Sequence, residues 1–156
     1  MGYYRAGFEV EGVDIKPQPH YPFKFYQADA LEFPLEGYDA YHASPPCQAY
    51  VDTNKGKETK HPKLIEPIRI RLQQVGNPFV IENVVGAPYL LASLMLCGTM
   101  FGLALFRHRY FELSFASPLS PYSCYHWGQV AKGEIAHVVN MHPHGKTING
   151  IRGKAP

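Results

Sequence analysis

The chain contains a series of short apolar stretches that end in polar or chemically reactive residues. Because these stretches alternate apolar and polar residues or form short apolar runs, they predict strands at residues 7–15, 23–31, 37–44, 79–84, 107–115 and 134–141. Strands that alternate with a helix and end in polar residues indicate an α/β sheet. In such a sheet ligands bind beyond the carboxyl ends of the strands, so we expect the functional residues along one edge.

One amphipathic helix is predicted over residues 62–76. Its apolar residues recur at helical spacing and are Leu64, Ile68, Leu72 and Val75. Three basic residues of the same segment, Lys63, Arg69 and Arg71, fall off this apolar stripe. The long apolar segment at 90–106 fits either a helix or a buried irregular chain.

Composition restricts the class of protein. The chain has 156 residues, of which 46% are hydrophobic and 18% are charged, and this balance is typical of one globular domain rather than of a disordered segment. The formal net charge of +2 is too small to indicate a polyanionic partner by itself. The three cysteines are widely spaced and odd in number, which argues for a reducing cytoplasm and against a disulfide framework. We find neither a signal peptide nor an apolar run of the roughly 18 residues that cross a membrane.

Pro45 and Pro46 separate the strand predicted at 37–44 from Cys47. Proline fixes φ and removes a backbone donor, so the backbone in front of the cysteine is rigid. A nucleophile gains from such pre-organisation. A cysteine that only packs in a core, which is the commoner case, does not need it. Both interpretations stay open on these residues alone.

Two further groups could take part in chemistry. Glu82 and Asn83 directly follow apolar strand residues, and burial of Glu82 would raise its pKa so that it could donate or accept a proton near neutral pH. Arg107 and Arg109 are expected on one face of a strand with His108 on the other, and two guanidinium groups suit an anion or the polar edge of a base. A solvated strand end and a solvated strand face are the alternative interpretations.

Cys124 is followed by several histidines, His126, His137, His142 and His144, and one cysteine with several histidines can bind zinc. The spacing matches no closed structural zinc site, and no second pair of cysteines is present in the sequence. The sequence therefore favours an ordinary loop here, and we assign no metal ligand from it.

Taken together, "SPPCQAY" (44–50), "IENV" (81–84) and "RHRYFE" (107–112) resemble in order and spacing the DNA (cytosine-5) methyltransferases, most of all the compact enzymes of phages and bacteria. That family has a Pro-Cys-Gln loop with the nucleophile, a Glu-Asn-Val strand end and an Arg-x-Arg strand. "GYYRAGFEVEGVDIKPQP" is similar to the segment that follows the family's glycine-rich cofactor loop, and "QADAL" is similar to the next strand end. The resemblance covers most of residues 1–115.

The resemblance implies the Rossmann-like fold of S-adenosylmethionine-dependent methyltransferases. The chain begins just after the place of the glycine-rich loop, so we expect that loop and the first strand to be missing. Residues 1–116 would form a partial catalytic domain, and residues 117–156 a loop-rich, reduced target-recognition or C-terminal segment. The implied activity is methylation of cytosine C5 in double-stranded DNA, as in restriction–modification, in the cytoplasm of a bacterium or a phage-infected cell. The alternative is an inactive fragment that at most binds DNA or a partner.

Site residues also follow from the resemblance. The catalytic residues that it implies are Cys47, Glu82, Arg109 and Arg107. The residues that it implies for binding S-adenosylmethionine are Asp14, Ile15, Asp29, Ala30 and Pro46. The residues that it implies as structural support are Asn83 and Gln48. In this scheme Cys47 attacks C6 of a cytosine flipped out of the duplex, Glu82 contacts N3, and Arg109 contacts O2.

Overall fold

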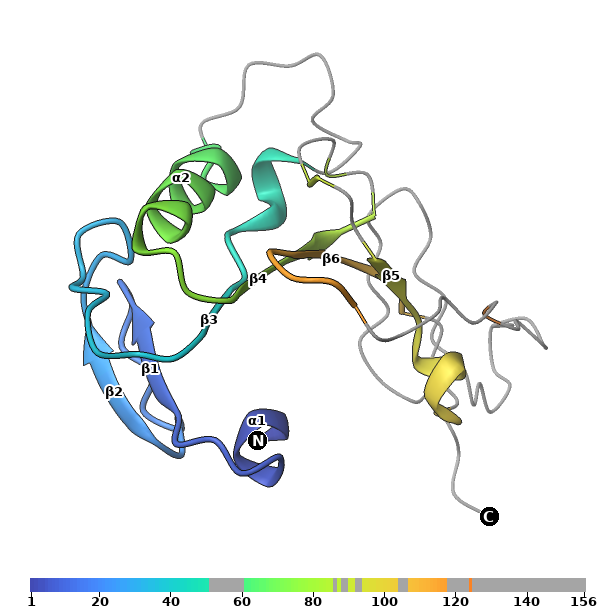
Figure 1. The fold of residues 1–156 in the computed structure, drawn as a ribbon, viewed down its shortest axis with the longest axis horizontal. Coiled ribbons are helices and arrows are strands. Elements are labelled where there is room, and N and C mark those ends of the chain that lie inside the picture. The colour runs from blue at the N-terminus through green and yellow to red at the C-terminus, as the bar shows by residue number, and fades with distance from the viewer. Residues whose placement is uncertain are drawn as a thin grey trace. The chain divides into compact units, whose positions relative to one another are not determined.

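The computed structural model describes residues 1–50, 61–85, 87, 90–91, 94–103, 107–117 and 124. The chain divides into two compact units, Met1–Tyr38 and Asp39–Pro156. In the described ranges each unit contains one sheet, and the protein is of mixed α/β type (Figure 1). The division falls inside the predicted catalytic segment 1–116, whereas the boundary predicted after residue 116 stays a prediction. No helix in these ranges is long and apolar enough to cross a bilayer.

The first unit is built on a pair of parallel strands. Its elements are α1 (Gly2–Arg5), β1 (Glu11–Asp14) and β2 (Lys24–Gln27). Both strands lie inside the segments predicted at 7–15 and 23–31 but are shorter than predicted. β1 ends early because the backbone N–H of Lys16 turns back and donates to Asp14 Oδ1 at 2.8 Å.

A cross-strand ion pair joins β1 to β2. Lys24 Nζ donates to Glu11 Oε1 at 2.7 Å, and the Tyr38 hydroxyl donates to Glu11 Oε2 at 2.6 Å. The hydrogen bond from Lys24, and next that from Tyr38, lower the pKa of Glu11. The same contact raises the pKa of Tyr38 to about 12. The neighbouring Gly12 lies under the ring of Tyr21, where an added Cβ would come within 2.5 Å of the ring.

The second unit holds a sheet with the strand order β3-β4-β6-β5 in the described ranges. Its elements are β3 (Tyr41–Ala43), α2 (Ile65–Val75), β4 (Phe79–Val84), β5 (Leu94–Leu96) and β6 (Arg109–Leu113). β3 runs parallel to β4, and β6 runs antiparallel to both of its neighbours. β4 has the predicted bounds, whereas β3 and β6 are shorter than the predicted strands at 37–44 and 107–115.

Two further segments complete the comparison with the sequence. The apolar segment 90–106, which fitted a helix or irregular chain, contains β5 and a 3₁₀ turn at Gly98–Phe101. The strand predicted at 134–141 lies outside the described residues.

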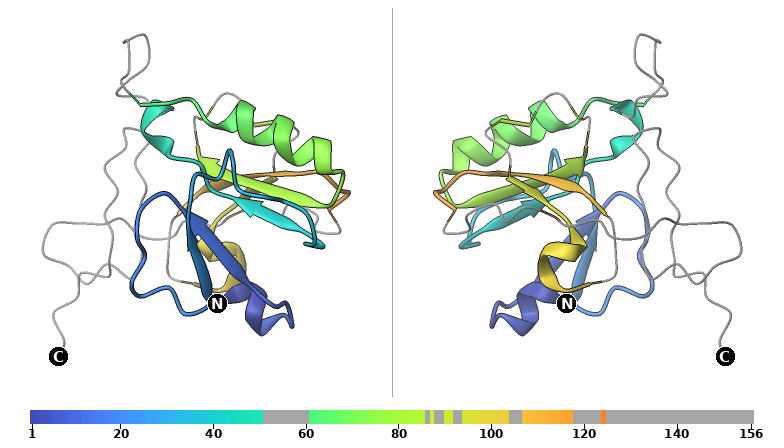
Figure 2. Two further views of the ribbon diagram at one scale, coloured as in Figure 1. Left: turned by 90° about the vertical axis from the view of Figure 1, so that its left-hand side faces the viewer. Right: turned by 90° about the vertical axis from the view of Figure 1, so that its right-hand side faces the viewer.

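Cross-strand pairing decides which side chains share a face of this sheet. Ile81 of β4 pairs with Glu112 of β6, so these two side chains point to the same face. Successive residues of a strand point to opposite faces, so Glu82 and Arg109 share the other face, one diagonal step apart. α2 lies along one face of this sheet (Figure 2), and the contact of its Arg69 with Glu112 identifies that face as the one with Ile81.

α2 packs with a face that differs from the predicted stripe. Its buried residues are Ile65, Ile68, Arg69 and Leu72. These positions are spaced three and four residues apart, so they form one face of a helix. Val75, which was predicted to belong to the stripe, is exposed, and Arg69, which was predicted to lie off it, is buried. The helix ends at Gly76, whose φ of +81° is in the left-handed region that favours glycine.

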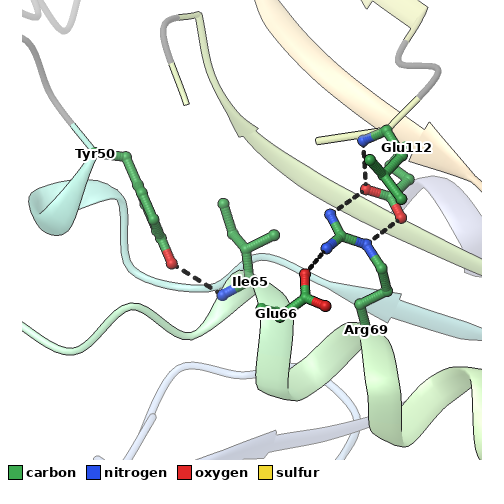
Figure 3. A network of polar contacts seen from close by, with 6 residues as sticks. Tyr50, Ile65, Glu66, Arg69 and Glu112 are labelled. Carbon is green, nitrogen blue, oxygen red and sulfur yellow. Dashed lines mark hydrogen bonds and ion pairs between the residues drawn. The ribbon is translucent and has the colours of Figure 1, made fainter. Parts of the chain in front are cut away.

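A buried ion pair explains the position of Arg69 (Figure 3). Arg69 and Glu112 are only 3% and 4% exposed. Arg69 donates twice to this carboxylate, Nε to Oε1 at 2.6 Å and Nη2 to Oε2 at 2.7 Å. The backbone N–H of Leu91 also donates to Glu112 Oε2 at 2.9 Å, and Glu66 of α2 accepts from Arg69 Nη1. The pair therefore links α2 to β6 through charge as well as packing.

Candidate active site

The loop after β3 presents Cys47 on a short, anchored turn. Pro45 is buried, and Pro46 has extended backbone angles (φ −51°, ψ 128°) that lead into a 3₁₀ turn at Cys47–Ala49. The N–H of Tyr50 donates to the carbonyl of Cys47 at 2.8 Å. The buried Tyr50 hydroxyl in turn accepts from the N–H of Ile65 at 3.0 Å, which ties the turn to the start of α2 (Figure 3).

Asn83 fixes the same loop to the end of β4. Its side chain is 2% exposed, and Nδ2 donates to the carbonyl of Pro45 at 2.8 Å. Its Oδ1 accepts from the N–H of Val84 at 3.0 Å. The amide therefore satisfies the carbonyl of Pro45, which only Pro46 separates from Cys47, as the resemblance implied for a supporting residue. A proline carbonyl in this buried place needs such a donor.

A pocket of about 300 Å³ opens between this loop and the sheet. The lining residues to which the family resemblance assigned a role are Pro46, Cys47, Gln48, Glu82, Asn83 and Arg109. Ser44 and Val84 also line it, although the sequence did not single them out. The pocket thus brings together residues from three segments that are far apart in the chain.

Glu82 and Arg109 form an ion pair in the pocket wall. Arg109 Nε lies 2.7 Å from Glu82 Oε1, and the two side chains are 16% and 20% exposed, respectively. Arg109 Nη1 also donates to the backbone carbonyl of His108 at 3.0 Å. Burial, and next the like charge of Arg107, lower the pKa of Arg109, while Glu82 and Cys47 act in the opposite direction. Cys47 lines the same pocket as this ion pair.

Arg107 does not take the position predicted for it. The strand begins at Arg109, so Arg107 and His108 precede it and do not alternate across its faces. Arg107 is exposed, and it does not line the pocket. The physical reason is that alternation in "RHRYFE" fits a strand that starts at either arginine, and pairing with β4 and β5 begins only at Arg109.

Most residues predicted to bind the cofactor belong to the first unit. Asp14 ends β1, and Asp29 lies just beyond β2, the parallel neighbour of β1. The N–H of Leu31 donates to Asp29 Oδ1 at 2.8 Å, so each of the two carboxylates accepts a backbone N–H of its own turn. Ile15 and Ala30 are exposed. In the described residues the predicted site residues therefore lie on the edges of two sheets instead of one.

No family model, no curated protein and no solved structure matches the chain.

Proposed function

We propose that the chain is a DNA (cytosine-5-)-methyltransferase that acts on double-stranded DNA and takes its methyl group from S-adenosylmethionine. One observation carries this proposal: a thiol, a carboxylate and a guanidinium from three separate segments line a single pocket of about 300 Å³. Cysteine is the strongest of the common protein nucleophiles. Glu82 can accept from the N4 and protonated N3 edge of cytosine, and Arg109 can donate to O2.

The residues of the pocket divide the chemistry between them. Cys47 Sγ forms a bond to C6 of the flipped base, and the electrons of the 5,6 double bond make C5 nucleophilic. Glu82 stabilises the electron-rich ring at N3, and Arg109 donates to O2 of the same base. After C5 has gained the methyl group it loses its proton, the C6–S bond breaks, and the double bond and the thiolate return. The two prolines and Asn83 keep Cys47 at a fixed height for this attack.

The residues predicted for S-adenosylmethionine suit that molecule. Asp14 ends β1 and Asp29 follows its parallel neighbour β2, and the N–H of Ala28 donates to the carbonyl of Asp14 at 3.1 Å. A carboxylate has about four lone-pair positions, so each retains capacity for hydroxyl or amino groups beside the N–H that it accepts. When bound, the cofactor supplies an electrophilic methyl group.

The strand pairings support a Rossmann-like fold. In the doubly wound order 3-2-1-4-5, the second strand pairs in parallel with the third and the fourth with the fifth. The pairs β1–β2 and β3–β4 are parallel pairs of this kind. In the described residues these two pairs belong to separate sheets.

A covalent trap tests the proposal. Fluorine at C5 cannot leave as a proton does, so a duplex pool rich in 5-fluorocytosine, incubated with the protein and S-adenosylmethionine, should give an adduct that survives denaturation. Peptide mapping should place the DNA on Cys47 and not on Cys97 or Cys124, which act as internal thiol controls. Cys47→Ser should give no adduct, and Glu82→Gln should slow its formation by at least about 10²-fold, the usual contribution of general acid–base catalysis.

A second readout does not depend on the cofactor. Addition of Cys47 to C6 makes C5 basic, so the protein alone should catalyse exchange of the C5 hydrogen of cytosine with solvent. Exchange without an adduct would place the defect in cofactor binding, which calorimetric titration with S-adenosylmethionine checks. A folded protein that gives neither exchange nor adduct would refute the proposed chemistry and favour an inactive fragment.

A further inference from the structure

Three potential metal ligands converge outside the pocket. Cys97, His108 and Cys124 each offer one ligand atom, and these atoms all lie within 4.8 Å of one another. His108 Nε2 is 3.4 Å from Cys124 Sγ. Cys97 lies between β5 and the 3₁₀ turn, and His108 lies directly before β6. The three residues come from separate segments of the chain, so their convergence is a product of the fold.

The spacing of these atoms matches what a tetrahedral zinc site requires. Zinc bonds of about 2.3 Å to sulfur and 2.0–2.1 Å to nitrogen put neighbouring ligands about 3.6–3.8 Å apart. The observed 3.4 Å between His108 Nε2 and Cys124 Sγ is already close to this value. The other ligand atoms are at most 4.8 Å apart, so they would have to approach one another by only about 1 Å. Two thiols and an imidazole are a soft donor set of the kind that zinc prefers.

The surroundings suit a bound ion rather than a pair of solvated thiols. Cys97 is only 1% exposed, and His108 and Cys124 are half-buried. The hydroxyl of Thr99 donates to Cys97 Sγ at 3.3 Å, as groups behind a metal ligand commonly do. All three cysteines of the protein are thiols, so Cys97 and Cys124 are available as ligands.

We propose that Cys97, His108 and Cys124 bind a zinc ion whose fourth position is taken by a ligand outside this trio. The ion fixes His108, and the carbonyl of His108 accepts the hydrogen bond from Arg109 Nη1. Zinc therefore holds in place the strand start that carries the pocket's guanidinium. The sequence offered Cys124 only the histidines that follow it and favoured an ordinary loop, whereas the fold supplies partners that precede it.

Metal analysis of the full chain tests this site. Protein purified under reducing conditions without chelator, or loaded with Zn²⁺ and desalted, should retain zinc in stoichiometric amount. Cys124→Ser should lose it, and this half-buried position can be changed with less risk to folding than Cys97. Cys47→Ser, which removes a thiol outside the trio, should retain it. Protein loaded with Co²⁺ should show thiolate-to-cobalt charge-transfer absorption that weakens in Cys124→Ser.

The outcomes separate this site from the proposed methyltransferase chemistry, because none of them measures activity. Zinc that stays stoichiometric in both Cys124→Ser and His108→Gln would overturn the assignment of these ligands. A folded wild-type chain that retains no zinc after loading would overturn the site itself. A disulfide between Cys97 and Cys124 in freshly reduced and desalted protein, seen as the loss of two hydrogens in mass spectrometry, would also overturn it.

Discussion

The buried pair of Arg69 and Glu112 makes a sharp prediction about stability. Replacement of Glu112 by leucine removes the acceptor of three donors: Arg69 Nε, Arg69 Nη2 and the N–H of Leu91. It leaves the guanidinium charge 3% exposed, with Glu66 as the acidic partner that remains. Breaking a buried pair by removing one partner costs about 3–5 kcal/mol. Because the exposed Glu66 still compensates part of the charge, Glu112→Leu should lower the free energy of unfolding by an amount near the lower end of that range. This is a large part of the roughly 5–15 kcal/mol that stabilises a typical domain.

The double substitution should behave differently. Arg69→Met with Glu112→Leu removes both charges and puts apolar groups of similar size in their place. Such replacements of buried pairs are neutral or stabilising by about 1–4 kcal/mol. The effects of the two single substitutions should therefore not add. Glu66→Gln is the matched control, because the Glu66 side chain is 61% exposed and an exposed pair contributes about 0–1 kcal/mol.

Urea unfolding at pH 7 measures all four variants, with an unchanged slope as the sign that only stability has changed. A loss below about 1 kcal/mol in Glu112→Leu would mean that water reaches the guanidinium, and would refute the description of the pair as buried. A double variant as unstable as the sum of the two single ones would refute the electrostatic explanation and indicate a packing defect.

Three further predictions concern other contacts. Asn83→Ala leaves the Pro45 carbonyl without its donor and should cost about 1–3 kcal/mol in urea unfolding and slow the adduct formation described above; unchanged values for both would exclude a bracing role. Glu11→Gln should lower stability at pH 7, since the bond from Lys24 lowers the pKa of Glu11. That difference should shrink as the pH falls below the ordinary glutamate pKa of about 4.3 and should vanish once the pH is below the lowered pKa of Glu11; a difference that does not shrink with pH would contradict an ionic origin. Gly76→Ala should cost about 1–2 kcal/mol through its left-handed φ alone, because no atom lies within 4 Å of the added Cβ; equal stability of the two proteins would contradict this.

Much of the pocket could be predicted from local sequence. β4 was predicted with its observed bounds because its apolar run starts after Pro78 and carries its polar residues at the end. Two prolines before Cys47 indicated a rigid loop, and the pocket lining includes Cys47, Glu82 and Arg109. Each of these features depends on residues that are close in sequence, so local pattern could single out Cys47, Glu82 and Arg109 as candidates. That they belong to one site was implied by the family resemblance.

The remaining features depend on partners far along the chain. The buried face of α2 was predicted from its apolar residues alone. Arg69 is also buried, because it forms an ion pair with Glu112 of β6. The start of β6 is set by pairing with β4 and β5, which excludes Arg107 from the strand. Cys97 and His108 gave no metal signal, since their distance in sequence fits no zinc motif and only the fold brings them to Cys124.

Buried and less buried side chains alternate along β4, and this pattern limits the insertions and deletions that the strand can tolerate over evolution. The strand buries Phe79, Ile81 and Asn83 and leaves Glu82 less buried, between two of them. An inserted or deleted residue inside β4 would exchange the environments of Glu82 and Asn83, and so would remove the acid from the pocket and the brace from the loop in one event. Length variation among homologues should therefore be absent from this strand and accumulate in the connection before it.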